Sequence, residues 1–322
     1  MPVLLMVASR RTEDIQFSQK VAERCGFDFE TCVDPIKLDD RMIERPQTIL
    51  FVDVDSAEAT TSGKPLSLSR IQPILAKRLK PRQCFALSSV PFSELKEATR
   101  TQTFSHYCVR HYDDFGVQWI SRLCFPLFSP EPFGLNFYSD HDAKVNMIEL
   151  KSAKERRIAL EAISNLLLKR ELHPRAVEMI LRVGDELLMN AIFDAPVDPN
   201  DDRYRKERPR DENFPLEGKE RVFLKLVFNE KFVVLGVHDQ FGSFVSKNAF
   251  DAAKKDYTEF EYRPDASVVG AGLGLHGIAA SGLCSMISCK AGVATEAVIA
   301  FPYYKNFKQT KSGFRSFSFN MR

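Results

Sequence analysis

The sequence predicts an α/β protein built from two domains. Its 322 residues are enough for two ordinary domains, and its 44% hydrophobic and 27% charged content is typical of a globular chain. Short apolar runs alternate with helical runs in the first part of the chain, whereas two long helical runs precede a group of strands in the second. We therefore expect one domain at residues 1–128, a linker at 129–146 and a second domain at 147–322.

The first domain is expected to be a doubly wound parallel sheet of the flavodoxin type. Apolar or alternating runs predict strands at residues 3–8, 27–33, 48–54, 84–87 and 106–109. Helical spacing predicts helices at residues 12–22, 68–79, 92–101 and 116–127. Strands and helices that alternate in this way form parallel β-α units, which favours a flavodoxin-like fold.

The second domain is expected to be a two-layer α/β sandwich. Pro, Gly, Ser and Asp are frequent in the linker before it. Helices are predicted at residues 148–170, 175–195 and 275–282, and strands at 222–228, 232–237, 286–290, 295–301 and 314–319. Residues 198–220 are dense in charge and proline and predict a mobile loop. Helices followed by antiparallel strands in this order suit a sandwich of one helical layer and one sheet.

Each of the two long helices carries an apolar stripe. In the first helix the stripe consists of Ile158, Ala162 and Leu166. In the second it consists of Val177, Ile180, Leu181, Gly184, Leu188, Ala191 and Ala195. We expect the second stripe to pack on the sheet.

Composition narrows the range of partners and compartments. The net charge of +2 gives no electrostatic case for a nucleic-acid partner, and no run approaches the roughly 20 apolar residues that span a bilayer. The 7 cysteines are scattered without a Cys-x-x-Cys pair, so we expect small core residues in a reducing cytoplasm. Arginines follow the apolar start instead of preceding it, so residues 1–9 indicate a first strand rather than a secretory signal.

Polar and glycine-rich segments follow one another through the second half of the chain. Glu186 and Asn190 stand four residues apart in a helical pattern, so they share a face beside the apolar stripe. Asp239 ends a buried strand, and residues 270–275 read Gly-Ala-Gly-Leu-Gly-Leu before a helix, where backbone amides can hold phosphate oxygens. This order of a carboxylate, a carboxamide, an aspartate and a glycine-rich loop indicates a pocket for ATP and Mg²⁺ without a P-loop.

The ordered set resembles the Bergerat-fold (GHKL, histidine-kinase-like) ATPases, most closely the anti-sigma-factor serine kinases, over roughly the last half of the chain. The resemblance implies that Asn190 binds Mg²⁺ through its side-chain oxygen and that Glu186 is a general base. It also implies that Asp239 accepts the exocyclic amine of adenine and that Thr295 faces the phosphates.

The same resemblance assigns further nucleotide contacts to glycine-bearing segments. These contacts fall on Gly242, Gly270, Gly272, Leu273 and Gly274. The family's Asp-x-Gly-x-Gly box is altered here, because Phe241 occupies the first glycine position and Ser243 the second. A side chain at the first position narrows the approach of the backbone to the base.

Each of these assignments has a structural alternative. Glu186 and Asn190 are compatible with a solvated helix face, Asp239 with a β-turn and Thr295 with a solvated loop position. His238, beside Asp239, indicates a packing or capping residue rather than a ligand.

The first domain resembles response-regulator receiver domains in the order and length of its elements. Asp53 stands where that family carries its phosphoacceptor, and Ser88 or Ser89 follows the fourth strand. Arg110 or His111 replaces the family's lysine. The place of the acidic pair that holds Mg²⁺ reads Ala-Ser-Arg at residues 8–10, so we expect Asp53 to take no phosphate. A plain turn residue is the alternative for Asp53.

The function predicted from these resemblances is a cytoplasmic signalling protein that binds ATP and Mg²⁺. It would phosphorylate a serine or threonine of a protein partner, such as a sigma factor, an anti-anti-sigma-like protein or another signalling protein, and could form a homodimer. The alternative is a non-enzymatic docking module with a degenerate nucleotide site. Histidine autokinase activity is disfavoured because residues 151–157, on the helix that precedes the site, contain no histidine.

Overall fold

A computed structural model describes residues 2–55, 68–90, 92–95, 102–200, 202–245, 278, 281, 283–303 and 313–322. These residues form an α/β fold that divides into two compact units. Unit 1 comprises Met1–Pro132 and Gly313–Asn320, and unit 2 comprises Phe133–Ser312 and Met321–Arg322. Within the described ranges no helix is both long and apolar enough to cross a bilayer.

Unit 1 alternates strands and helices as the sequence predicts. Its described elements are β1 (Leu4–Ala8), α1 (Thr12–Cys25), β2 (Asp28–Thr31), α2 (Pro35–Glu44), β3 (Thr48–Asp53), α3 (Leu68–Arg78), η1 (Pro81–Gln83), β4 (Cys84–Ser88), η2 (Phe92–Glu94), β5 (His106–Val109), α5 (Asp114–Cys124) and β11 (Arg315–Met321). The helix predicted at 92–101 begins as the single 3₁₀ turn η2, and its last six residues lie outside the described residues.

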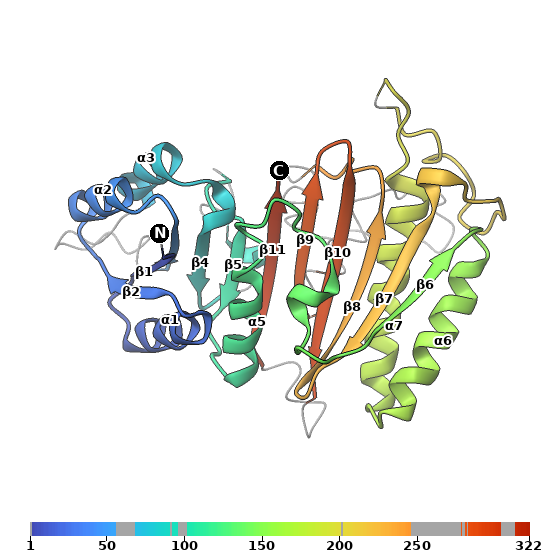
Figure 1. Cartoon of the computed structure of the whole chain (residues 1–322), viewed down its shortest axis with the longest axis horizontal. Coiled ribbons are helices and arrows are strands. Elements are labelled where there is room, and N and C mark those ends of the chain that lie inside the picture. The colour runs from blue at the N-terminus through green and yellow to red at the C-terminus, as the bar shows by residue number, and fades with distance from the viewer. Residues whose placement is uncertain are drawn as a thin grey trace. The chain divides into compact units, whose positions relative to one another are not determined.

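The sheet of unit 1 runs in the order β2-β1-β3-β4-β5, with all four of these pairings parallel. Figure 1 shows α1 and α5 on one side of these strands and α2 and α3 on the other. Strands β1, β3 and β4 are buried along their whole length, as expected when helices cover both faces of a parallel sheet. The predicted doubly wound sheet is therefore confirmed.

Strand β11 belongs to unit 1, whereas the sequence placed residues 314–319 in the second domain. It pairs antiparallel with β5, and the indole of Trp119 donates to the hydroxyl of Ser316 at 2.9 Å. The ring of Phe314 lies so close to Gly116 that a Cβ there would stand 2.6 Å from it. Alternating apolar residues identify a strand, but they do not identify the sheet that it joins.

Unit 2 contains one sheet and two long helices. Its described elements are η3 (Leu135–Tyr138), β6 (Val145–Leu150), α6 (Glu155–Lys169), α7 (Pro174–Met189), η4 (Asn190–Asp194), η5 (Gly218–Glu220), β7 (Val222–Phe228), β8 (Phe232–Asp239), β9 (Cys284–Lys290) and β10 (Ala294–Pro302). The strands run in the order β9-β10-β8-β7-β6 with every pairing antiparallel, and Figure 1 shows α6 and α7 together on one face. This is the two-layer α/β sandwich that the sequence predicts.

Helix α7 packs on the sheet through the predicted stripe. Val177, Ile180, Gly184 and Leu188 are buried, and only Leu181 is half-buried. A Cβ on Gly184 would stand 2.8 Å from the side chain of Leu235 on β8. The glycine therefore allows the helix to approach the strand closely.

The prediction for the preceding helix was wrong in two respects. Residues 148–150 belong to strand β6, so helix α6 begins only at Glu155. The buried face of α6 consists of Ala159, Ile163 and Leu167, whereas Ile158 is 64% exposed. A shift of one residue turns a helical stripe by about 100°, so an error in the phase of a weak pattern exchanges the buried and exposed faces.

The predicted linker and the charged loop both pack against unit 2. In the linker Leu135 and Tyr138 are buried, and the amide of Gly134 donates to the buried carboxylate of Glu296 at 2.6 Å. In the charged segment Phe214 and Leu216 are buried. The predicted linker includes η3 and the first residues of β6, and buried apolar side chains anchor both segments.

Candidate functional site

Unit 2 contains a cavity of about 210 Å³ on the side of its sheet that faces α7. Strands β8, β9 and β10, the end of α7, helix η4 and the loops that follow η4 and β8 contribute to its lining. The lining residues are Leu187, Asn190, Ala191, Asp194, Ala195, Arg203, Lys206, Val237, Asp239, Ser243, Phe244, Val245, Ile287, Thr295 and Ala297. Three predicted site residues therefore share one cavity: Asn190, Asp239 and Thr295.

Asn190 lies where the helix changes its winding. The α-helix ends at Met189, and a π-helical turn runs from Asn190 to Asp194. Single π turns in helices occur frequently at functional sites because they redirect side chains. The half-buried Asn190 side chain lines the cavity with the neighbouring Ala191 and Asp194.

Glu186 does not line the cavity that the described residues form, although it lies one turn before Asn190. Its side chain is exposed, and Arg156 forms an ion pair at 2.6 Å with the neighbouring Asp185. Partial desolvation and the charge of Asp185 raise the pKa of the Glu186 carboxyl. The helix face that Glu186 shares with Asn190 is therefore not enough to bring this carboxylate to the cavity.

Asp239 is the last residue of β8 and is 6% exposed. Its carboxylate accepts hydrogen bonds from the amides of Phe241 at 2.9 Å and Gly242 at 3.4 Å. Burial raises the pKa of Asp239 to about 6, and the hydrogen bonds from these amides and from Thr295 limit the rise. The buried carboxylate therefore lies beside the cavity with neutral donors around it.

Thr295 stands directly opposite Asp239 on the neighbouring strand β10. Its side chain is 7% exposed, and its hydroxyl lies 3.8 Å from the thiol of Cys289. Thr295 therefore lies against the carboxylate that the resemblance assigns to adenine, and its contact with phosphates stays a prediction.

Gly242 has a conformational role in the described structure and does not line the cavity. Its φ is +62°, and a Cβ there would overlap the carbonyl of Lys290 and the amides of Val293 and Ala294. Its own carbonyl accepts from Gly292 at 3.2 Å. Gly242 therefore fixes the loop after β8 against the β9–β10 turn, and the residues after it reach the cavity.

The remaining predicted nucleotide contacts belong to the glycine-rich segment at residues 270–275. Gly270, Gly272, Leu273 and Gly274 lie outside the described residues, as does most of the helix predicted at 275–282.

Two cationic residues of the cavity were missed by the sequence analysis. Arg203 and Lys206 come from the charged loop after η4. The guanidinium of Arg203 donates to the carbonyls of Asp194 at 2.7 Å and Ser243 at 3.4 Å, so it joins the ends of η4 and of the loop after β8. The charge density of the loop was visible in the sequence, but its contact with the helix is a long-range feature.

His238 lies beside Asp239 but is a packing residue, as predicted. Its ring makes edge or tilted contacts with Phe133 and Phe223 at 5.5 and 6.1 Å, and it stands 3.8 Å from the buried carboxylate of Glu296. Burial lowers the pKa of His238.

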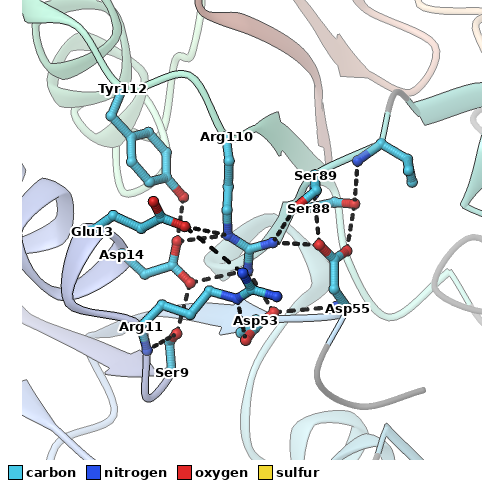
Figure 2. Close-up of polar contacts among 11 residues, drawn as sticks. Ser9, Arg11, Glu13, Asp14, Asp53, Asp55, Ser88, Ser89, Arg110 and Tyr112 are labelled. Carbon is cyan, nitrogen blue, oxygen red and sulfur yellow. Dashed lines mark hydrogen bonds and ion pairs between the residues drawn. The ribbon is translucent and has the colours of Figure 1, made fainter. Parts of the chain in front are cut away.

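Unit 1 contains a second polar cluster at the carboxyl ends of its strands (Figure 2). Arg110, directly after β5, forms ion pairs with Asp14 at 2.9 Å, Asp53 at 2.5 Å and Asp55 at 2.5 Å. Arg11 forms a further ion pair with Asp53 at 3.2 Å. Of the two candidates for the lysine position, the structure therefore places Arg110 at the aspartate.

One carboxylate of this cluster was not predicted from the sequence. Residues 8–10 lack an acidic pair, but Asp14 in the first turn of α1 is fully buried within the same cluster. It accepts hydrogen bonds from Ser9 at 2.6 Å and Tyr112 at 2.7 Å. An acidic group is therefore present, and Arg110 rather than a lack of carboxylates distinguishes this site.

Ser88, the last residue of β4, and Ser89 complete the cluster through Asp55. The hydroxyl of Ser88 and the amide of Ser89 donate to its carboxylate at 2.7 and 2.8 Å. Burial raises the pKa of Asp55, but these hydrogen bonds and the charge of Arg110 lower it overall. No group of three His, Cys, Asp or Glu side chains in the described part of the chain is arranged to hold a metal ion.

The chain was compared with protein families, curated sequences and solved structures. Neither a protein-family model nor a curated protein sequence matches the chain. Among solved structures, it is similar to a chain of the SiaB–SiaC complex from Pseudomonas aeruginosa at 13% identity and a TM-score of 0.31. That match covers 48% of this chain and 88% of the other, and at this TM-score we draw no inference from it.

Proposed function

We propose that unit 2 binds an adenine nucleotide in the cavity beside Asp239. The polarity of the cavity carries this proposal. Asp239 and Thr295 provide a buried acceptor and a hydroxyl on adjacent strands, and Arg203 and Lys206 provide positive charge from the loop. A nucleotide has the matching polarity, since its base carries an amine donor and its phosphates are anionic.

The state of Asp239 favours a ligand with an N–H donor. An ionised carboxylate is acceptor-only, and burial makes this one costly to ionise, as its pKa of about 6 shows. A hydrogen bond from an exocyclic amine would stabilise the charged form. Adenine offers such a donor, and a net contribution of about 1.5–3 kcal/mol is typical of a hydrogen bond to a charged group.

The size of the cavity limits what it encloses. Pockets for drug-sized ligands usually measure about 300–1,000 Å³, so a cavity of about 210 Å³ suits a single base rather than a whole nucleotide. We infer that the phosphates extend from the cavity toward the cationic loop, and that the Asn190 side chain would supply an oxygen ligand to Mg²⁺.

Phosphoryl transfer to a serine or threonine of a protein partner is the second candidate. The carboxylate of Glu186, one helical turn before Asn190, favours it, since such transfer can use a general base. The exposed position of Glu186 outside the cavity lining favours a binding module instead. We therefore propose nucleotide binding that controls the docking of a protein partner, and we treat kinase activity as an additional step to be tested.

Calorimetric titration of the full chain tests nucleotide binding. We expect ATP to bind in a Mg²⁺-dependent way and more tightly than GTP, and Asp239→Asn to weaken ATP binding about tenfold or more. Asp211→Asn, which neutralises an exposed carboxylate of the charged loop, is the matched control and should leave affinity unchanged. Equal affinities for ATP and GTP would contradict the assignment.

Labelled ATP separates the two candidates. If the protein is a kinase, Glu186→Gln should retain ATP affinity but lose roughly 10²–10⁴-fold in the rate of transfer, whereas Asn190→Ala should lose Mg²⁺-dependent binding. The measurement follows γ-labelled phosphate from ATP in wild type and Glu186→Gln with a co-purified partner fraction. Label that reaches neither protein nor free phosphate in the wild type would exclude the kinase and leave the binding module.

A further inference from the structure

The guanidinium of Arg110 is the centre of the polar cluster in unit 1. Its Nε and Nη2 atoms donate to the two oxygens of Asp14 at 2.9 and 3.0 Å, and Nη2 also donates to Asp53 at 2.5 Å. Its Nη1 atom donates to Asp55 at 2.5 Å. A planar fork with five N–H donors can satisfy three carboxylates at once.

The burial of the cluster makes this cation necessary. The side chains of Asp14, Asp53 and Arg110 are 0%, 2% and 5% exposed. Carboxylates that are removed from water and held close together repel one another, and they stay charged only if a cation neutralises them. Arg11 supplies a second positive charge to Asp53, but its side chain is 42% exposed, so solvent screens it more strongly.

The groups around Arg110 are those that a hard divalent cation prefers. Three carboxylates and the hydroxyl of Ser88 converge at the carboxyl ends of β3 and β4 and the start of α1 (Figure 2). Oxygen ligands of this kind bind Mg²⁺, Mn²⁺ or Ca²⁺. In the described structure these carboxylates are arranged around the guanidinium, and no three of them are placed to hold a metal ion while it is present.

Arg110 also joins the backbone of several elements. Its amide donates to the carbonyl of Ser88 at 2.7 Å, and its Nη1 atom lies 3.2 Å from the hydroxyl of Ser89. With the carboxylates this links α1 and the ends of β3, β4 and β5. The arrangement of this edge of the sheet therefore depends on one side chain of the protein itself.

We propose that Arg110 is an internal counter-ion that takes the place of a divalent cation in unit 1. The carboxyl edge of the sheet then keeps one conformation whether or not divalent cations are present. Removal of the guanidinium would convert the cluster into a divalent-cation site that uses Asp14, Asp53 and Asp55. This inference concerns unit 1 alone and does not depend on nucleotide binding by unit 2.

The test is thermal unfolding and Mn²⁺ titration of the full chain without nucleotide. Wild type should show no Mn²⁺-dependent shift in Tm. Arg110→Ala should lose roughly 10 °C in Tm, regain much of it as Mn²⁺ is added to millimolar concentration, and lose this recovery when Asp53→Asn is added. Arg78→Ala removes an ion pair to Asp39 in the same unit that is more exposed, and it should respond to Mn²⁺ no more than wild type does.

Arg110→Lys keeps the test decisive. The lysine retains a positive charge without the planar fork, so this variant should lose part of the Tm but still exclude Mn²⁺. If Arg110→Ala does not fold, refolding in Mn²⁺ replaces the titration, and recovery of the folded state supports the proposal. Mn²⁺ binding by wild type at Asp53, or a folded Arg110→Ala that binds no Mn²⁺, would overturn it.

Discussion

Asp53 in unit 1 and Asp239 in unit 2 both end a buried strand, but the protein holds their carboxylates in opposite ways. Asp53 forms ion pairs with Arg110 and Arg11 at 2.5 and 3.2 Å. Asp239 accepts hydrogen bonds from two backbone amides and from Thr295, all of them neutral donors. Among the described residues Asp239 has no cationic partner.

This difference separates a closed site from an open one. At Asp53 the protein supplies the counter-charge, and a guanidinium fills the space around the carboxylate. At Asp239 burial raises the pKa to about 6, and a cavity lies beside the carboxylate. The same residue type at the same place in a strand therefore lies in a closed ion-pair cluster in one unit and beside a cavity in the other, where we propose that it recognises a ligand.

The largest effect is expected where the counter-charge is internal. Arg110→Ala leaves Asp14 and Asp53 buried without their main cation, and breaking a buried ion pair in this way typically costs about 3–5 kcal/mol of unfolding free energy. Arg78→Ala removes a more exposed pair with Asp39 and should cost less than about 1 kcal/mol. Urea unfolding of both variants measures the difference. Equal losses of unfolding free energy would show that the buried cluster around Asp53 depends on its arginine no more than the exposed Asp39 pair does.

Asp239→Asn should stabilise the protein at neutral pH, whereas Arg110→Ala should destabilise it. The folded pKa of about 6 lies above the ordinary value of 3.8, so the stability that this group contributes is fully present below pH 4 and is lost as pH rises through 6. The loss amounts to about 3 kcal/mol at neutral pH. Asp239→Asn should therefore be more stable than wild type at pH 7 and lack this part of the pH dependence, as urea unfolding across pH 4–8 would show. A variant that is less stable than wild type at pH 7 would contradict the open-site interpretation.

The loop after Asp239 offers a matched pair of glycines. Gly242 and Gly292 have similar φ values of +62° and +70°, but a Cβ meets backbone atoms only at Gly242. Alanine at either position would adopt a left-handed backbone conformation, which lowers the unfolding free energy by about 1–2 kcal/mol. Gly242→Ala should cost at least about 1 kcal/mol more, because it also displaces the amides that bind Asp239. Identical Tm values for the two variants would show that this contact is not important.

The smallest effect concerns the cationic loop. Lys206 is exposed, so Lys206→Ala should weaken ADP binding only about two- to fivefold, as expected for a screened charge. Adenosine, which lacks phosphates, should bind both proteins equally. An equal loss for ADP and adenosine in calorimetry would place Lys206 at the base rather than at the phosphates.

Local patterns predicted the elements that carry the two aspartates, because buried strands and their ends are visible over a few residues. Asn190 and Asp239 were placed in one site by their order along the chain, and the structure brings them to one cavity. Asp14 and Arg203 were missed, since each acts on a segment that is distant in sequence. Glu186 was predicted to join Asn190 in the site but does not line the cavity. A shared helix face does not determine how far a side chain reaches into a neighbouring cavity.

Strand β11 has a consequence for how the chain is made. Unit 1 includes Met1–Pro132, yet its sheet is completed by a strand at Arg315–Met321. During synthesis residues 133–312, nearly all of unit 2, therefore leave the ribosome before the last strand of unit 1 emerges. Until then the edge of β5 and the surface around Trp119 stay uncovered. Synthesis of roughly 200 residues at 5–20 residues per second takes on the order of ten seconds or more. A fragment that stops at Pro132 should retain this exposed edge and aggregate through it.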